Sequence, residues 1–264
     1  MKRIPYRSIL AKYRRLVACE LILSAVAIVM AIGLPGCATG GPETPAAAVS
    51  TTVDKTEQSA ITPDEVLARL EEGNRRFVGG NSFRRDYPAQ VKATAAGQYP
   101  IAVVLSCMDS RSSPEIVFDQ GIGDLFVVRV AGNYATADIL GSLEYATKVA
   151  GAKLVVVMGH TECGAIKGAC DDVKLGNLTT VIQALQPAVE DVKDFQGDRT
   201  SKNKQFVLLV TEANVRRTVA KIRADSPILR DLEQSDQIKI IGAIDDISTG
   251  EVTFFDWDAP HVGA

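Results

Sequence analysis

The apolar positions of the chain fall into short continuous runs and longer stretches with helical spacing. Three aliphatic runs are flanked by turn residues: IAVVLS at 101–106, LFVVRV at 125–130 and KLVVVMG at 153–159. Runs of this length, rich in β-branched residues, are typical of parallel strands that are covered on both faces. QIKIIGAIDDI at 237–247, followed by STGE and VTFFDW, predicts a strand, a turn and an antiparallel strand.

Two stretches have the period of an amphipathic helix. Thr62 is a predicted N-cap, with Pro63 next to it and Glu65 three residues further on, and apolar residues at helical spacing follow. Residues 204–223 could hold a strand and a helix, but their spacing favours mostly helix. Because the aliphatic runs alternate with helix-compatible segments such as ADILGSLEYATKVAG, the pattern predicts an α/β fold with a mostly parallel sheet.

The first 37 residues have the features of an export signal. A basic start precedes the apolar stretch LILSAVAIVMAIGL at 21–34 and then PGC, and 14 apolar residues are short for a membrane span. The small residues before Cys37 resemble the lipobox of bacterial lipoproteins, in which the signal is cut before a cysteine that receives lipid. We therefore expect lipidation at Cys37 and a membrane-anchored protein in the bacterial periplasm; an uncleaved anchor helix is the alternative.

The signal is followed by a segment of different composition. Residues 38–60 are rich in Ala, Thr, Pro and Gly and lack an apolar period, which predicts a flexible tether. The folded domain is expected at residues 61–258, and residues 259–264 are expected to be a tail.

Composition and charge limit the classes of partner. The 264 residues are 46% hydrophobic and 23% charged, which suits one sizeable domain with extensions. Residues 1–36 hold six basic residues and one acidic residue, so the remainder has 23 basic and 31 acidic residues and a net charge of −8. This balance argues against a nucleic-acid partner or an anionic-membrane surface on the folded part.

Residues that could carry out chemistry follow two of the predicted strands, in VVLSCMDSRSS at 103–113 and VVVMGHTECGA at 155–165. In open parallel sheets, ligands bind beyond the carboxyl ends of the strands. Cys107, His160 and Cys163 make a soft sulfur, nitrogen and sulfur set that suits zinc. Three protein ligands leave the fourth tetrahedral position open, which indicates a catalytic zinc site.

Other interpretations of these residues are possible. A disulfide between Cys107 and Cys163 would suit an exported protein, but it would leave His160 unexplained. A structural zinc would need a fourth ligand, which the sequence does not clearly offer. Cys170 fits a small buried hydrophobic residue better than a ligand, and His261 is expected in the solvated tail.

Asp109 and Arg111 lie two residues apart, so on an extended segment their side chains would point the same way and could pair. An ordinary surface ion pair is the alternative. Because the pair lies next to predicted metal ligands, we expect Arg111 to hold Asp109 ionised and oriented. Asp109 would then accept a hydrogen bond from the zinc-bound water.

These residues resemble the β-class carbonic anhydrases. The CxDxR and HxxC motifs of that family stand here as Cys107-Met108-Asp109-Ser110-Arg111 and His160-Thr161-Glu162-Cys163. The stretches PEIVFDQGIGDLFVVRVAGNYA and GSLEYA between them are also similar, and the resemblance spans about residues 61–256.

The resemblance implies a fold and an activity. The fold would be β-carbonic anhydrase-like, with a central, mostly parallel four-stranded sheet, an antiparallel edge strand, helices on both faces and an N-terminal helical arm. A zinc hydroxide, on one Zn²⁺ per chain, would convert carbon dioxide to bicarbonate and a proton. The family assembles as dimers or multiples of dimers, with pocket residues crossing the interface.

Further residues match family positions. Gln98, Phe126, Ala131 and Tyr145 match positions that line the small substrate pocket, and Gln98 is typical of the plant-like subgroup. Members with a regulatory bicarbonate site carry a tryptophan three residues before the first cysteine ligand, where this chain has Val104. We therefore expect no such inhibitory site.

Two other functions are compatible with the motifs. A hydrolase of carbonyl sulfide or carbon disulfide on the same fold would use the same zinc chemistry. A non-catalytic lipoprotein that binds zinc or bicarbonate would not need Asp109 and Arg111, and both are present.

Overall fold

The computed structural model describes residues 48–255. The predicted export signal, Cys37, His261 and the predicted domain end at residue 258 lie outside the described residues. The strands are β1 (Ala102–Ser106), β2 (Leu125–Arg129), β3 (Leu154–His160), β4 (Lys239–Asp245) and β5 (Val252–Phe255). The α-helices are α2 (Lys55–Ala60), α3 (Pro63–Val78), α4 (Tyr87–Thr94), α5 (Pro114–Val117), α6 (Ala137–Glu144), α7 (Gly164–Cys170), α8 (Leu178–Glu190), α9 (Lys204–Asp225) and α10 (Pro227–Gln234), and η1 (Tyr145–Val149) is a π-helix.

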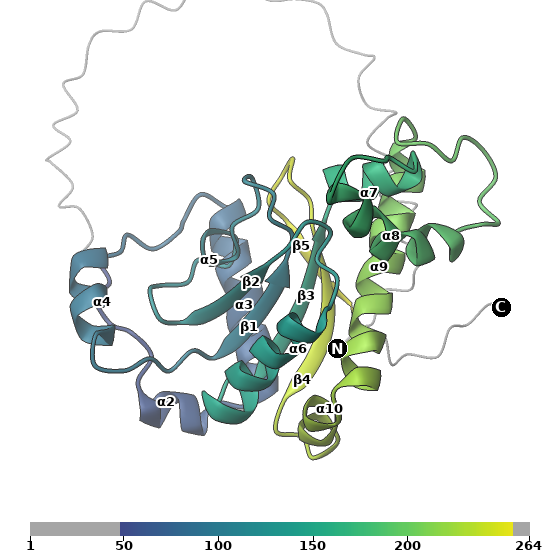
Figure 1. Ribbon diagram of the computed structural model, residues 1–264. Helices are drawn as coiled ribbons and strands as arrows, with labels where there is room; N and C mark the ends of the chain where they lie inside the picture. Colours follow the sequence, from purple (N-terminus) through teal and green to yellow (C-terminus); the bar gives the residue numbers. More distant parts are fainter. Residues whose placement is uncertain (1–47, 256–264) are drawn as a thin grey trace, which may run out of the picture. The chain divides into compact units, whose positions relative to one another are not determined.

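The five strands form one sheet in the order β2-β1-β3-β4-β5 (Figure 1). The first four are mutually parallel and β5 is antiparallel to β4, which confirms the prediction of a mostly parallel sheet with an antiparallel edge strand. β1 and β3 are buried along their whole length, as the continuous aliphatic runs predicted.

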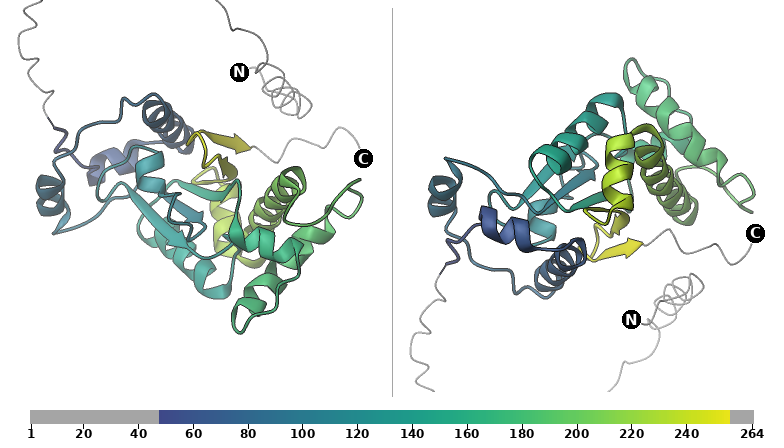
Figure 2. Two further views of the ribbon diagram at one scale, coloured as in Figure 1. Left: turned by 90° about the horizontal axis from the view of Figure 1, so that it is seen from above. Right: turned by 90° about the horizontal axis from the view of Figure 1, so that it is seen from below.

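Helices cover both faces of the sheet, as Figures 1 and 2 show. Val103 and Leu105 of β1 belong to one core cluster with residues of α6, α9 and α10. Ala102 and Val104 point to the opposite face, where they pack with residues of α3 and α5. Because successive strand residues alternate between faces, each aliphatic run contributes to both clusters.

A third core cluster lies under helices α7, α8 and α9. It contains Cys107 and Cys163 together with fully buried Ile182, Leu185 and Phe206. The two cysteines therefore sit on a packed apolar layer.

Helix α3 begins where the sequence predicts. The Thr62 hydroxyl accepts a hydrogen bond from the Glu65 amide, and the Glu65 carboxylate accepts one from the Thr62 amide, so the predicted capping box is present. The predicted helix over 204–223 is also confirmed, as α9, and Asn203 caps its first turn.

The structure differs from the predicted tether over residues 48–60. Val49 pairs with Arg85 in an isolated parallel bridge, and its carbonyl accepts a hydrogen bond from the Asp86 amide. Asp54 caps α2 by accepting hydrogen bonds from two backbone amides. Local capping and pairing thus order a segment that composition alone marked as flexible. Between residues 48 and 255, every helix is too short or too polar to cross a membrane.

The carboxyl ends of the four parallel strands meet at one edge of the sheet. Cys107 follows β1 directly, and Arg129, His160 and Asp245 are the last residues of β2, β3 and β4. The chain leaves β1 towards β2 and leaves β3 towards β4, so the strand order reverses between β1 and β3. This reversal is where open α/β sheets place their ligands.

Candidate metal centre

The structure brings Cys107, His160 and Cys163 together at this edge of the sheet. The two sulfurs and a ring nitrogen of His160 lie within 4.8 Å of one another, and all three residues are buried. Cys163 reaches the group as the N-cap of α7, because Glu162 adopts a left-handed backbone conformation with φ +58°. This turn reverses the chain between β3 and α7, and no residue pattern around Glu162 predicts it.

The geometry fits a metal ion better than a disulfide. The sulfurs of Cys107 and Cys163 are 3.9 Å apart, about twice the length of a disulfide bond, and both cysteines are free. Nδ1 of His160 lies 2.9 Å from the Thr161 carbonyl, so it donates there and leaves Nε2 as the ligand atom. Nε2 is buried without a hydrogen-bond partner among the described residues, as expected of a metal ligand.

The two cysteines have strongly different acidities. A hydrogen bond from the Cys163 thiol lowers the pKa of Cys107 to about 4 despite burial, and the Gly132 amide also donates to the Cys107 sulfur, at 3.4 Å. The pKa of Cys163 is raised, because its proton is held by the Cys107 thiolate and because the group is buried. Cys107 is therefore the more acidic of the two thiols.

His160 is buried next to this pair. Burial lowers the pKa of its ring, but the negative Cys107 sulfur outweighs that effect, so the pKa is raised above its ordinary value. A divalent cation between these groups would displace the protons, since only the thiolate and the neutral imidazole bind metal.

Asp109 and Arg111 form the predicted ion pair. Nε and Nη2 of Arg111 donate to the two carboxylate oxygens of Asp109 at 2.9 and 2.8 Å, and the Arg111 amide donates at 3.0 Å. The Arg111 hydrogen bonds lower the pKa of Asp109 well below its usual range. Oδ2 of Asp109 lies 3.8 Å from Nε2 of His160, so the carboxylate borders the candidate metal position.

Arg129 supports this loop, a role that sequence reasoning missed. Its guanidinium donates to the backbone carbonyls of Cys107, Asp109 and Ser112. In the sequence, Arg129 could have been noticed as the single charged residue at the end of an apolar run.

Asp245 and Ser112 were also missed. The Ser112 hydroxyl donates to Oδ2 of Asp245 at 2.6 Å, across 133 residues of sequence. Both residues are only 1% exposed, and burial raises the pKa of Asp245. Cys170 is half-buried against the third core cluster, and burial raises its pKa to about 11, which agrees with a packing role.

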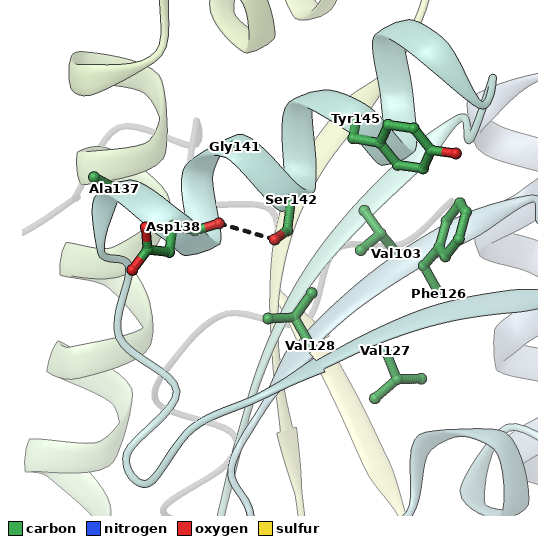
Figure 3. Close-up of a pocket in the computed structure, with 9 residues that line it drawn as sticks. All are labelled: Val103, Phe126, Val127, Val128, Ala137, Asp138, Gly141, Ser142 and Tyr145. Atoms are coloured by element: carbon green, nitrogen blue, oxygen red, sulfur yellow. Dashed lines mark hydrogen bonds between the residues drawn. The ribbon is translucent and has the colours of Figure 1, made fainter.

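The predicted pocket residues are only partly brought together. Phe126 and Tyr145 contact edge to face, with ring centroids 6.1 Å apart, and line an open groove of about 540 Å³ beside β2 and α6 (Figure 3). Phe126 is level with Val103 in the sheet, about 13 Å along β1 from Cys107. Gln98 is exposed before the start of β1, at the other end of that strand, whereas Ala131 is half-buried next to the Gly132 amide that contacts Cys107.

Comparison with known proteins identifies the family. The model of the family described as carbonic anhydrase matches residues 102–252. Carbonic anhydrase 2 of Mycobacterium tuberculosis is 36% identical over 200 residues, which cover 74% of this chain and 91% of the relative. A carbonic anhydrase of Pseudomonas aeruginosa is 32% identical over 185 residues, or 66% of this chain and 83% of the relative.

Solved structures agree at the level of the fold. A tetrameric β-carbonic anhydrase of Sordaria macrospora superposes with a TM-score of 0.57 at 24% identity, covering 72% of this chain and 96% of the other. A Coccomyxa β-carbonic anhydrase in complex with acetazolamide gives 0.55 at 24% identity, covering 71% and 85%. With the buried cysteine, histidine and cysteine cluster beside a paired aspartate and arginine, these likenesses show that the chain belongs to the β class of the carbonic anhydrase family.

Proposed function

We propose that the protein catalyses the reversible, zinc-dependent hydration of carbon dioxide to bicarbonate and a proton. The observation that carries the proposal is the convergence of two buried cysteines and a buried histidine next to a bidentate aspartate–arginine pair. The relatives with 32% and 36% identity are named carbonic anhydrases, which favours this reaction over sulfur-gas hydrolysis or simple binding.

Cys107, His160 and Cys163 would hold one Zn²⁺ per chain. Two thiolates and an imidazole are ligands that zinc prefers, and three protein ligands leave room for a reacting molecule. When bound, the ion supplies a Lewis acid that makes water acidic enough to act as a nucleophile near neutral pH.

Asp109 would accept a hydrogen bond from the attacking water. Its carboxylate stays ionised because Arg111 donates to both of its oxygens, so it accepts hydrogen bonds and does not donate them. Oδ2 of Asp109 lies 3.8 Å from Nε2 of His160, so this oxygen would be within reach of a water held at the metal position. An acceptor in a fixed position would favour the orientation of the water in which a lone pair of the water oxygen points at carbon dioxide.

Stopped-flow carbon dioxide hydration by the zinc-loaded chain tests the function, with zinc per chain determined on the same sample. We expect rapid, zinc-dependent hydration and a fall in kcat of about a hundredfold in Asp109→Asn, which is at the low end for loss of a proton-transfer group. Full zinc occupancy with no hydration between neutral and alkaline pH, but turnover of carbonyl sulfide or carbon disulfide, would reject the proposal.

We propose that the chain works as a homodimer or a multiple of it, with the groove beside β2 facing a second copy. β2 is an edge strand whose residues Leu125 to Val128 are half-buried. Phe126, which contacts Tyr145, lies about 13 Å along the sheet from Cys107 of its own chain. In such an assembly, Gln98, Phe126 and Tyr145 of one copy would line the carbon dioxide pocket of the other, with Ala131. The Sordaria relative is tetrameric. Light scattering that shows a monomer at micromolar concentration would contradict this.

We further propose that the enzyme belongs to the plant-like subgroup that lacks the regulatory bicarbonate site. Val104 is fully buried where a tryptophan would be needed, and the Arg129 guanidinium is engaged by three carbonyls. Initial rates of hydration should therefore show no cooperative inhibition by added bicarbonate. A sigmoidal loss of activity with bicarbonate at neutral pH would overturn this assignment.

The proposed location is the bacterial periplasm, with lipid on Cys37 as the membrane anchor. It rests on the apolar stretch 21–34 and the small residues before the cysteine. Labelling of expressing cells with radioactive palmitate should mark the wild-type chain and not Cys37→Ala. Equal labelling of both chains, or of neither, would contradict the anchor.

A further inference from the structure

Asp245 is a buried carboxylate for which the reaction described above has no use. It ends β4, is level with His160 in the sheet and is 1% exposed. Oδ2 accepts the Ser112 hydroxyl at 2.6 Å, and Oδ1 has no partner among the described residues. Burying a carboxylate with so few hydrogen bonds costs stability, so its presence at this edge points to a role other than stability.

Ser112 links Asp245 to the Asp109 loop. Its amide donates to the Asp109 carbonyl at 3.2 Å, which closes the turn that carries Asp109 and Arg111. Its carbonyl accepts from Arg129 at 2.9 Å. The turn is thus held by Arg129 from the β2 side and by the Ser112–Asp245 contact from the β4 side.

The contact is short enough to fix the turn. An O–H···O distance of 2.6 Å is typical of a hydrogen bond to a charged oxygen, which is stronger than a neutral one. Both partners are buried and so protected from competing water. Arg111, by contrast, is 53% exposed, and it orients the Asp109 side chain but does not anchor the turn.

We propose that Asp245 is a positioning residue, which acts through the Ser112 hydroxyl to hold the Asp109 turn at the metal centre. The inference deepens the proposed function and rests on it for its catalytic consequence. The required property is a fixed acceptor for Ser112, so an amide oxygen at position 245 should partly replace the carboxylate.

Three variants and a matched control test the proposal in the full zinc-loaded chain. Ser112→Ala removes only the hydroxyl, Asp245→Leu removes the acceptor at similar volume, and Asp245→Asn keeps an acceptor. The control is Ser226→Ala, because the Ser226 hydroxyl also donates to a carboxylate, Glu144, at 2.6 Å across 82 residues. That contact lies towards the amino ends of the parallel strands, where η1 leads into β3.

Hydrogen exchange measures the turn without using activity. The amides of Arg111 and Ser112 both donate to Asp109, so exchange in a peptide covering residues 107–113 reports whether the turn is closed. We expect exchange at least about fivefold faster in Ser112→Ala and Asp245→Leu, a smaller change in Asp245→Asn, and no change in Ser226→Ala.

Kinetics measure the consequence for the reaction. We expect kcat to fall about tenfold in Ser112→Ala with KM little changed, and the loss to be absent when Ser112→Ala is added to Asp109→Asn. Additive losses, or unchanged kcat despite faster exchange, would overturn the catalytic role. If Ser112→Ala and Asp245→Leu exchanged no faster than the Ser226→Ala control, the proposal that Asp245 holds the turn would be overturned. If the wild type did not hydrate carbon dioxide, the proposed function would fail, and the exchange rates would still decide whether Asp245 holds the turn.

Discussion

The thiols of Cys107 and Cys163 differ in acidity, and a metal ion can bind both sulfurs only after both have lost their protons. Cys107 is the more acidic thiol, because the hydrogen bond with Cys163 lowers its pKa to about 4. Cys163 has a raised pKa and keeps its proton, and the raised pKa of His160 keeps its ring protonated to a higher pH than usual. Metal binding must remove these protons.

Zinc affinity should therefore rise with pH. Loss of the Cys163 proton contributes about a tenfold gain per pH unit, and the slope should steepen below the raised pKa of His160, where a second proton must leave. Competition with a coloured chelator at pH 6, 7 and 8 would measure it, with Cys170→Ser as a control that keeps the slope. A pH-independent affinity would contradict the assigned protonation states.

At the residue scale, the sequence predicted the residues that lie within short motifs. Cys107, Asp109 and Arg111 are spaced by two, and His160 and Cys163 by three, so local spacing carried the signal. The contact between Ser112 and Asp245 crosses 133 residues and obeys no local spacing. Such contacts depend on strand order and register, which the aliphatic runs do not specify.

At the element scale, α3 shows how close packing can outweigh helix propensity. Gly73 faces the end of α5, and a Cβ atom there would lie 1.8 Å from the Phe118 carbonyl oxygen. Gly73 is therefore required by the approach of two backbones and not by the helix itself.

Gly73→Ala should destabilise the protein although alanine is the better helix former. The propensity gain of about 1 kcal/mol should be outweighed by about 3 kcal/mol of overpacking, which lowers the free energy of unfolding by about 2 kcal/mol. Urea unfolding measures the difference, and Glu72→Ala, at the exposed neighbouring position, should stay within about 0.5 kcal/mol of wild type. A more stable Gly73→Ala chain would show that α3 and α5 can move apart.

Removal of the α3 cap should have a smaller effect. Thr62→Ala leaves the Glu65 amide without its capping acceptor and should lower the free energy of unfolding by about 1 kcal/mol. Thr62→Ser keeps a hydroxyl and serves as the control in the same denaturant titration. Equal losses in both variants would assign the effect to the threonine methyl group.

The elements found from sequence were those with long periodic patterns. α3, α9 and all five strands were predicted, because each has a cap signal, a sustained period or an aliphatic run. Helices α2, α4, α5, α7, α8 and α10 were not predicted individually; α2 and α4, with six and eight residues, show little apolar period. The π-helix η1 continues α6 without a break, and its wider turn has no counterpart in the apolar pattern.

At the scale of the whole molecule, the metal centre lies in one of the three core clusters found among residues 48–255. Cys107 and Cys163 belong to the cluster formed with α7, α8 and α9, so a bound ion would tie β1 to that helical layer. The other two clusters lie on the two faces of the sheet and do not include the ligand residues. Metal binding should therefore stabilise the α7–α9 layer most.

Removal of the metal should lower Tm and loosen that layer. A ligand at a thousandfold excess over its Kd adds about 4 kcal/mol to stability, which corresponds to a Tm shift of about 10 °C for a domain of this size. Calorimetry before and after dialysis against a chelator would measure the shift, and re-addition of zinc should restore Tm. Exchange protection lost evenly over the whole sheet would contradict a local effect.

The sequence identified the sheet type but not the register between strands. Aliphatic runs specify buried parallel strands, whereas the order β2-β1-β3-β4-β5 and the pairing of His160 with Asp245 follow from packing between distant segments. The groove beside β2 likewise appears only once β2 is known to be an edge strand.

The docking of Val49 against Arg85 limits the length of chain that lies between the described domain and the proposed lipid anchor at Cys37. If lipid is attached at Cys37 as proposed, only residues 38–47 separate the anchor from the described domain, and ten residues reach at most about 35 Å when fully extended. The catalyst would thus be confined to a thin layer next to the membrane. Carbon dioxide that crosses the bilayer would meet it within nanometres, before diffusing into the surrounding volume.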